Sequence, residues 1–173
     1  MSIERVLLSV QPRFASALLD GSKTVELRRR RARIADGALC LLYATSPTCA
    51  LVGAIRIATT DAASQDTLWS RYATVMGLTR HEYDAYLAGA TRPCAILVSA
   101  ATVFTQPVTL SELRRRYQAF VAPQSYRFLR EREARSLLNG QHRRLEYLTS
   151  DQLAAAPMRE PETARGSSAT MRS

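Results

Sequence analysis

Short apolar segments follow one another closely along most of this chain, with helix-like segments inserted between them at a few points. Five segments have the branched apolar residues or the alternation typical of β-strands, at 5–10, 24–29, 38–44, 50–58 and 94–104. Strands that are mostly neighbours in sequence, with helices inserted between some of them, favour the α+β class. We therefore predict a small mixed β-barrel flanked by helices.

The helices are predicted from their end signals. Pro12 suits the first turn of a helix, and Gly21 ends that helix. Thr79 and Glu82 have the spacing of a capping box, which opens a short helix ending near Gly89. Further helical segments are predicted at 109–116, 123–129 and 130–138.

A chain of 173 residues is long enough for one well-filled core with a tail. We expect one domain over residues 1–150, including a C-terminal helical extension. Residues 151–173 are rich in Ala, Pro, Arg, Glu, Ser and Thr and offer no apolar face, so a disordered tail is expected there. No apolar run approaches the roughly 20 residues needed to cross a bilayer. The N-terminus also lacks the layout of a signal peptide, and we expect a cytoplasmic protein.

The net charge of +9 and the pI near 10.2 favour a polyanionic partner. Nucleic acid is the first candidate and an acidic membrane surface the second. The three cysteines contain no Cys-x-x-Cys pair, and the two histidines have no metal-ligand spacing. We expect reduced thiols, no metal and no other cofactor.

Lys23 is the only lysine among 24 basic residues. An ammonium is a compact charge whose pKa shifts readily on burial, whereas a guanidinium is a planar fork that stays charged. Arginine-rich coding that left one lysine by chance is the alternative to a functional role. The neighbours favour a role, because Gly21 precedes Lys23, Glu26 follows it, and a run of arginines begins at Arg28.

The pattern Gly21-x-Lys23-x-x-Glu26-x-Arg28, after a strand and a helix, matches the G-x-K-x-x-E-x-R signature of the ASCH (activating signal cointegrator homology) family. The chain resembles this family of the PUA-like superfamily over roughly residues 3–130. The segments 43–47, 95–103 and 123–127 agree with the resemblance. It implies a barrel with a cleft beside the first helix that faces RNA or a modified base.

The resemblance also implies possible activities: RNA binding, ribonuclease action, or removal of the acetyl group from acetylcytidine. In the amidohydrolase branch the motif lysine acts with a threonine three residues later and with a distant glutamate. Lys23 matches the lysine, Glu26 occupies the threonine position, and Glu82 is the nearest candidate for the distant acid. We take Lys23 and Glu26 as the catalytic candidates, with a salt bridge at the barrel rim as the alternative.

The candidates for nucleic-acid contact come from three short segments. Guanidinium groups suit phosphates and stack on bases, and the alternative is a solvated charge run. Tyr43 is the best aromatic candidate for base stacking, and loop serines can donate hydrogen bonds to a ligand. The candidates are Arg28, Arg29, Arg30, Arg31, Tyr43, Ser46 and Ser125. Alternation along the strand predicted at 24–29 places Glu26 and Arg28 side by side on its polar face, and on a strand Arg28 and Arg30 would share one face.

The sequence therefore predicts an RNA-binding domain, or one that binds a nucleotide with a modified base, in a basic cleft. A metal-independent ribonuclease or an acylcytidine amidohydrolase that uses Lys23 is the alternative. A regulatory domain that grips a protein partner is a third possibility.

Overall fold

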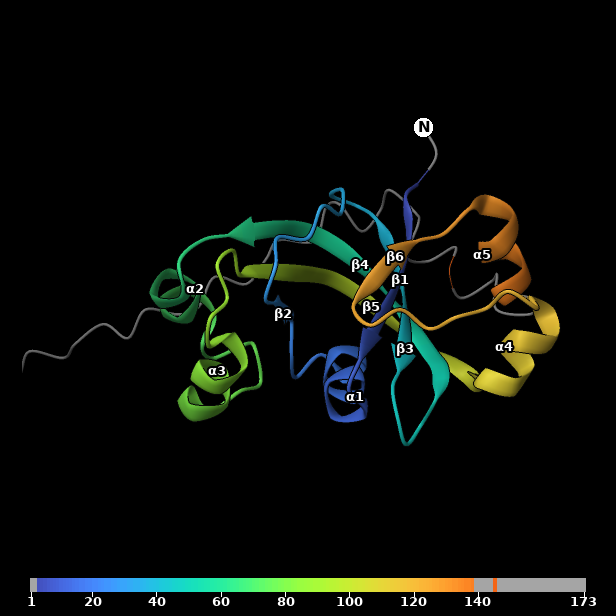
Figure 1. The fold of residues 1–173 in the computed structure, drawn as a ribbon, viewed down its shortest axis with the longest axis horizontal. Helices are drawn as coiled ribbons and strands as arrows, with labels where there is room; N and C mark the ends of the chain where they lie inside the picture. The colour runs from blue at the N-terminus through green and yellow to red at the C-terminus, as the bar shows by residue number, and fades with distance from the viewer. Residues whose placement is uncertain (1–2, 139–144, 146–173) are drawn as a thin grey trace, which may run out of the picture.

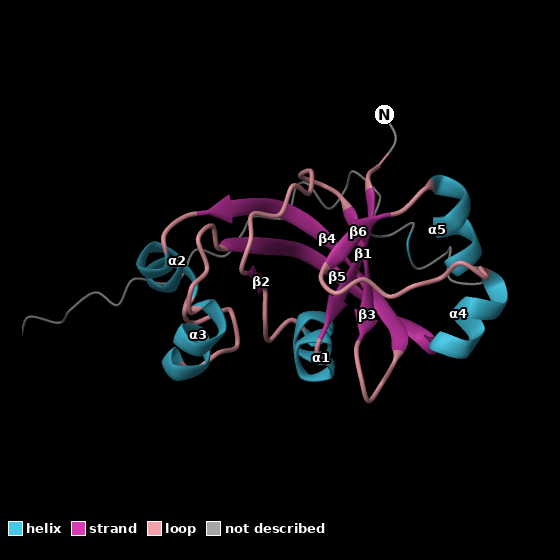
Figure 2. Ribbon diagram, in the orientation of Figure 1, coloured by secondary structure: helices cyan, strands magenta, loops and turns pink. Residues whose placement is uncertain are grey.

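The computed structural model describes residues 3–138 and residue 145, and its elements are labelled in Figures 1 and 2. The strands are β1 (Arg5–Val10), β2 (Val25–Arg28), β3 (Leu39–Ala44), β4 (Ala50–Ala62), β5 (Cys94–Thr109) and β6 (Tyr126–Phe128). The helices are α1 (Pro12–Asp20), α2 (Gln65–Tyr72), α3 (Arg80–Leu87), α4 (Leu110–Arg116) and α5 (Glu131–Leu137).

The strands form one mixed sheet in the order β2-β5-β4-β3-β1-β6. β1 runs parallel to β3, with Leu7 beside Leu41, and the other neighbouring strands are antiparallel. The sheet curls into a half-barrel, and the long strands β4 and β5 lie side by side in it (Figure 1). The predicted α+β class, with a PUA-like mixed sheet flanked by helices, is confirmed.

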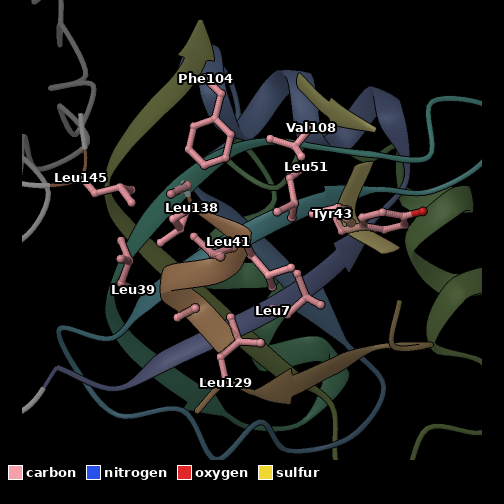
Figure 3. Packing of buried hydrophobic residues seen from close by; sticks show 14 of the residues in the cluster. Leu7, Leu39, Leu41, Tyr43, Leu51, Phe104, Val108, Leu129, Leu138 and Leu145 are labelled. Carbon is pink, nitrogen blue, oxygen red and sulfur yellow. The ribbon is translucent and has the colours of Figure 1, made fainter. Parts of the chain in front are cut away.

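Both faces of the sheet are covered because its central strands are apolar on both sides. In β3, Leu41 and Tyr43 belong to a cluster that includes Leu113 of α4 and Leu137 of α5. Figure 3 shows part of this cluster. The alternate residue Leu42 packs with α1 on the opposite face. A third cluster joins α2 and α3 to β2 and the start of β5.

Helix ends form where the sequence signals predict them. Gly21 adopts a φ of 82°, a left-handed conformation that glycine reaches without strain, and α1 ends there. Thr79 and Glu82 make the predicted capping box at the start of α3. These two ends matter because α1 and α3 flank the cleft described below.

One predicted element is wrong. A helix is predicted over 123–129, but Tyr126–Phe128 is strand β6. It pairs antiparallel with β1, with Tyr126 opposite Leu8, and so satisfies the backbone groups on the outer edge of β1. Because this pairing joins segments far apart in the sequence, the local sequence pattern does not predict it.

Strands β4 and β5 are both longer than the predicted segments 50–58 and 94–104. β5 continues past Pro107 to pair with the start of β4, where the register of the two strands shifts. The predicted tail at 151–173, and most of the predicted extension up to residue 150, lie outside the described residues. Within the described part of the chain, no helix is long and apolar enough to span a bilayer.

Candidate functional site

A cleft with a volume of about 460 Å³ lies between α1 and α3, beside the ends of β1 and β2. The side chains of the predicted motif, Lys23, Glu26 and Arg28, line it together. The other lining residues are Ser9, Val10, Gln11, Arg13, Phe14, Leu27, Thr45, Leu78, Glu82, Ala85, Tyr86 and Gln124. The predicted cleft beside the first helix is therefore present.

Lys23 is buried, with 1% of its surface exposed. It follows the Gly21 turn, and its backbone N–H donates to the carbonyl of Ala17, which fixes the chain against α1. The next residue, Thr24, donates its N–H to the carbonyl of Val75 in the segment between α2 and α3. That segment covers the amine, and Lys23 Nζ donates to the carbonyl of Met76 at 2.5 Å.

Glu26 links the two cations of the motif. One carboxylate oxygen lies 3.4 Å from Lys23 Nζ, and the other lies 3.3 Å from Arg28 Nη2. β2 places Glu26 and Arg28 on one face, while Val25 and Leu27 enter the core on the other. The sequence predicted this shared face, and the structure shows that the face is buried.

The environment of Lys23 lowers its pKa. Burial lowers the pKa of Lys23 below its ordinary value of 10.5, and the nearby Arg28 and Arg13 add to this, while Glu26 opposes it. The Lys23 ammonium also lies 4.9 Å from the centre of the Phe14 ring. A lysine held in this way is suited to gain or lose a proton at the wall of a cleft.

Two buried polar atoms of cleft residues have no hydrogen-bond partner within the described protein: Ser9 Oγ and Arg28 Nε. Arg28 Nη2 donates to the Ser9 carbonyl at 2.9 Å, so the guanidinium is held in place while one donor stays unused. An unmet buried polar group typically costs about 1–3 kcal/mol. The Arg28 Nε–H donor is enclosed in the wall of the cleft.

An ion pair between α1 and α3 lies at the cleft. Arg13 Nη1 donates to Glu82 Oε1 at 2.8 Å, and the Arg13 guanidinium lies 4.3 Å from the centre of the Phe14 ring. Hydrogen bonds from Thr79 and Arg13 lower the pKa of Glu82 to about 2. Glu82, the candidate for the distant acid, is thus an ionised carboxylate in the same cleft as Lys23.

The arginine run after β2 separates into different surroundings. β2 ends at Arg28, so the strand alternation expected for the run stops there. Arg29 donates to the carbonyl of Ala88 at the end of α3, at 2.7 Å. Arg30 is exposed, and Arg31 lines a second hollow away from the cleft. Of the four predicted arginines, the structure places Arg28 in the cleft wall.

Three other predicted contact residues do not line the cleft. Tyr43 is 4% exposed, and its ring packs in the core 6.0 Å from the ring of Phe120, because alternation along β3 turns it to the opposite face from Leu42 (Figure 3). Ser46 is exposed in the loop after β3. Ser125 is exposed, and its carbonyl accepts from Ser9, which brings its neighbour Gln124 to the cleft.

Sequence reasoning missed the aromatic residues of the cleft. Phe14 fits the apolar spacing of the first helix, which by itself indicates packing. Tyr86 lies on α3, is 38% exposed, and donates its hydroxyl to the carbonyl of Leu27 at 3.2 Å. Its position four residues after Glu82 places both on one face of α3 and was the available signal.

This arrangement of a curled half-barrel, with a buried amine, a carboxylate and a guanidinium in a cleft beside the first helix, can be compared with known proteins. An ASCH domain-containing ribonuclease from Zymomonas mobilis is 32% identical over 136 residues, which are 79% of this chain and 91% of that protein. The crystal structure of ASCH from Zymomonas mobilis matches with a TM-score of 0.73 at 32% identity, over 78% of this chain and 93% of that one.

More distant matches agree in fold or in part of the sequence. A hypothetical protein from Leishmania major matches with a TM-score of 0.53 at 14% identity, over 83% of this chain and 98% of that one, which shows the fold alone. A large ribosomal subunit protein uL22 from Ureaplasma parvum is 25% identical over 127 residues, 73% of this chain and 40% of that protein. No protein-family model matches the chain. On the Zymomonas comparison, this chain belongs to the ASCH domain family.

Proposed function

We propose that this domain binds RNA, or a nucleotide with a modified base, in the cleft lined by Lys23, Glu26 and Arg28. The observation that carries the proposal is the buried amine–carboxylate–guanidinium group in the wall of a cleft of about 460 Å³. Ligand sites of this size typically combine apolar walls with a few fixed polar groups. The net charge of +9 and the relative named as a ribonuclease support RNA as the ligand.

The cleft offers a distinct contact for each part of a nucleotide. The Lys23 ammonium and the Arg28 guanidinium are donors, and the Glu26 carboxylate is an acceptor. The half-exposed ring of Tyr86 offers a face on which a base can stack. The cations Arg13 and Arg28 supply positive charge for a phosphate.

We expect Lys23→Met to weaken RNA binding by about tenfold or more, because it removes a charged hydrogen-bond donor but keeps the length of the side chain. Fluorescence anisotropy with a labelled single-stranded RNA measures the affinity, and circular dichroism checks the fold. Tyr86→Ala is a second variant on the more exposed side of the cleft. Loss of a stacked base should cost about 1–3 kcal/mol of binding free energy there.

Two results would contradict the proposal. One is an unchanged affinity in folded Lys23→Met and Tyr86→Ala across a salt titration. The other is an RNA affinity of the parent no greater than that of an unrelated protein of equal net charge, which would favour a protein partner instead.

A ribonuclease is the second candidate, and the lowered pKa of Lys23 beside the carboxylate of Glu26 favours it. An amine with a lowered pKa can act as a general base closer to neutral pH than an ordinary lysine does. Removal of an acetyl group from acetylcytidine has less support, because Glu26 stands where the resemblance calls for a threonine.

Incubation of the protein with labelled RNA and with acetylcytidine, each with and without chelator, separates these activities from binding alone. Turnover that is lost in Lys23→Met while RNA is still bound would establish the enzyme. RNA binding without turnover at high protein concentration would establish a binding module.

A further inference from the structure

A second hollow, with a volume of about 520 Å³, lies beyond the end of β2, where Arg31 ends the arginine run. It is formed by residues from the end of β4, the start of α2 and the loop between α3 and β5. Its lining residues are Arg31, Ala62, Ala63, Ser64, Gln65, Ala90, Thr91, Arg92 and Pro93. The lining is small or uncharged apart from two arginines.

These two arginines, Arg31 and Arg92, come from separate segments of the chain and meet at one hollow. Both are exposed, and the described residues give neither guanidinium a hydrogen-bond or ion-pair partner. The described lining holds no carboxylate. In the first cleft, by contrast, Glu26 and Glu82 pair with the cations. The second hollow is therefore the more purely cationic of the two.

The polar groups at the start of α2 are already used within the protein. Ser64 Oγ accepts from Thr67, and the Gln65 side chain donates to the carbonyl of Leu87. The two arginines and the Thr91 hydroxyl are thus the groups left to meet a ligand. A planar guanidinium fork matches phosphate oxygens, and two forks in one hollow favour an anion with several oxygens.

A short stretch of chain connects the cleft to the hollow. Arg28 lines the first and Arg31 the second, and three residues of extended chain span at most about 11 Å. Between them, Arg29 is tied to the end of α3 by its bond to Ala88. A single strand with one nucleotide in the cleft can therefore reach Arg31 within a few nucleotides.

We propose that the hollow lined by Arg31 and Arg92 binds a backbone phosphate of the same single-stranded RNA whose nucleotide occupies the cleft. The inference rests on the proposed function, since it takes the cleft as the site of that nucleotide. It adds a second point of attachment that makes affinity depend on the length of the RNA.

The test is a length series of labelled oligouridylates, from a dinucleotide to a dodecanucleotide, measured by fluorescence anisotropy on the full chain. Affinity should rise on the order of tenfold once the RNA is long enough to reach the hollow. The double variant Arg31→Ala/Arg92→Ala should lose this gain and bind the dinucleotide as the parent does. The slope of its salt dependence should be shallower by about 0.7 for each phosphate that the arginines no longer neutralise.

The matched control is Arg30→Ala/Arg33→Ala, which removes the same charge from exposed positions that line neither the cleft nor the hollow. This control should keep the gain with length. Equal losses in the two double variants would overturn the inference, because the effect would then be one of net charge.

Two further outcomes also decide the matter. Binding of inorganic phosphate that depends on Arg31 and Arg92, without any gain in RNA affinity with length, would show a free-anion site and overturn the inference. Dinucleotide binding that is insensitive to Lys23→Met, together with a length gain that needs Arg31 and Arg92, would support an RNA contact at the hollow. That last result would contradict the proposed function of the cleft while it leaves the RNA contact at the hollow in place. A failure of the proposed function can therefore be told apart from a failure of the inference about the hollow.

Discussion

Lys23 and Arg28 share the carboxylate of Glu26 but respond differently to burial. A guanidinium stays charged at any pH that a protein tolerates, whereas the charge of a buried ammonium is balanced against the cost of desolvation. The contacts of Lys23 with Met76, Glu26 and Phe14 offset part of that cost. Of the two cations, Lys23 is therefore the one whose charge depends on its surroundings.

The lowered pKa of Lys23 predicts a dependence of stability on pH. Between that lowered pKa and the ordinary value of 10.5, the unfolded chain binds more protons at this position than the folded chain does. The contribution of Lys23 to the free energy of unfolding should therefore rise with pH through this window. Urea denaturation of the parent and of Lys23→Met at about pH 7 and about pH 10 measures the difference.

Subtracting the variant cancels the tyrosines and cysteines, which titrate in both proteins. The advantage of the parent over Lys23→Met should be larger at the higher pH. An advantage that shrinks as pH rises would mean that the folded protein holds the proton more tightly than the unfolded chain. The assignment of Lys23 as a desolvated amine would then be wrong.

The position of α1 on the sheet sets the width of the cleft, because α1 carries Arg13 and Phe14. It packs against β3, β4 and β5, and Gly53 of β4 lies beneath it. A Cβ at Gly53 would lie 2.4 Å from the Thr102 carbonyl oxygen and 2.6 Å from a methyl carbon of Leu19. The register of β4 against β5 also shifts beside this glycine.

We expect Gly53→Ala to lower the free energy of unfolding by about 1–3 kcal/mol, because the added methyl must displace either the Thr102 backbone or α1. Displacing α1 should also weaken RNA binding. Thr59→Ala, at an exposed position on the same strand, is the control and should change stability by no more than about 0.5 kcal/mol. Thermal unfolding and anisotropy measure the two effects. Equal stability of the two variants would show that the strands accommodate the methyl group.

The positive charge of the molecule is distributed over surfaces with different surroundings. Some arginines are paired in or near the cleft, two meet at the second hollow, and Arg114 and Arg115 lie in the last turn of α4. Charges outside a binding site attract RNA over distance, and salt screens that attraction beyond about 8 Å at 0.15 M. The net charge of +9 should thus assist encounter more than it determines the bound position.

Arg114→Ala/Arg115→Ala should weaken RNA binding several-fold at low salt and by little at about 0.15 M salt, because both residues lie outside the cleft lining. Lys23→Met should weaken it under both conditions. Anisotropy titrations at the two salt concentrations make the comparison. A loss at the higher salt as large as that of Lys23→Met would place the RNA over α4 instead of the cleft.

Local patterns predicted the parts of this protein that depend on neighbouring residues in the chain. The Gly21 helix end, the Thr79 capping box and the shared face of Glu26 and Arg28 all follow from spacing that the backbone geometry of a helix or strand imposes. The motif of Lys23, Glu26 and Arg28 named three residues that line the cleft, and the family resemblance implied a cleft beside the first helix.

Long-range contacts determined the rest. Residues 126–128 form strand β6 because they pair with the outer edge of β1. Tyr43 is buried because α4 and α5 cover its face of the sheet. Lys23 is desolvated because Met76, 53 positions along the chain, lies over its amine. Side chains become buried, and residues far apart in sequence come together, only when the chain folds back on itself. A short segment of sequence does not specify which distant segments will pack against it.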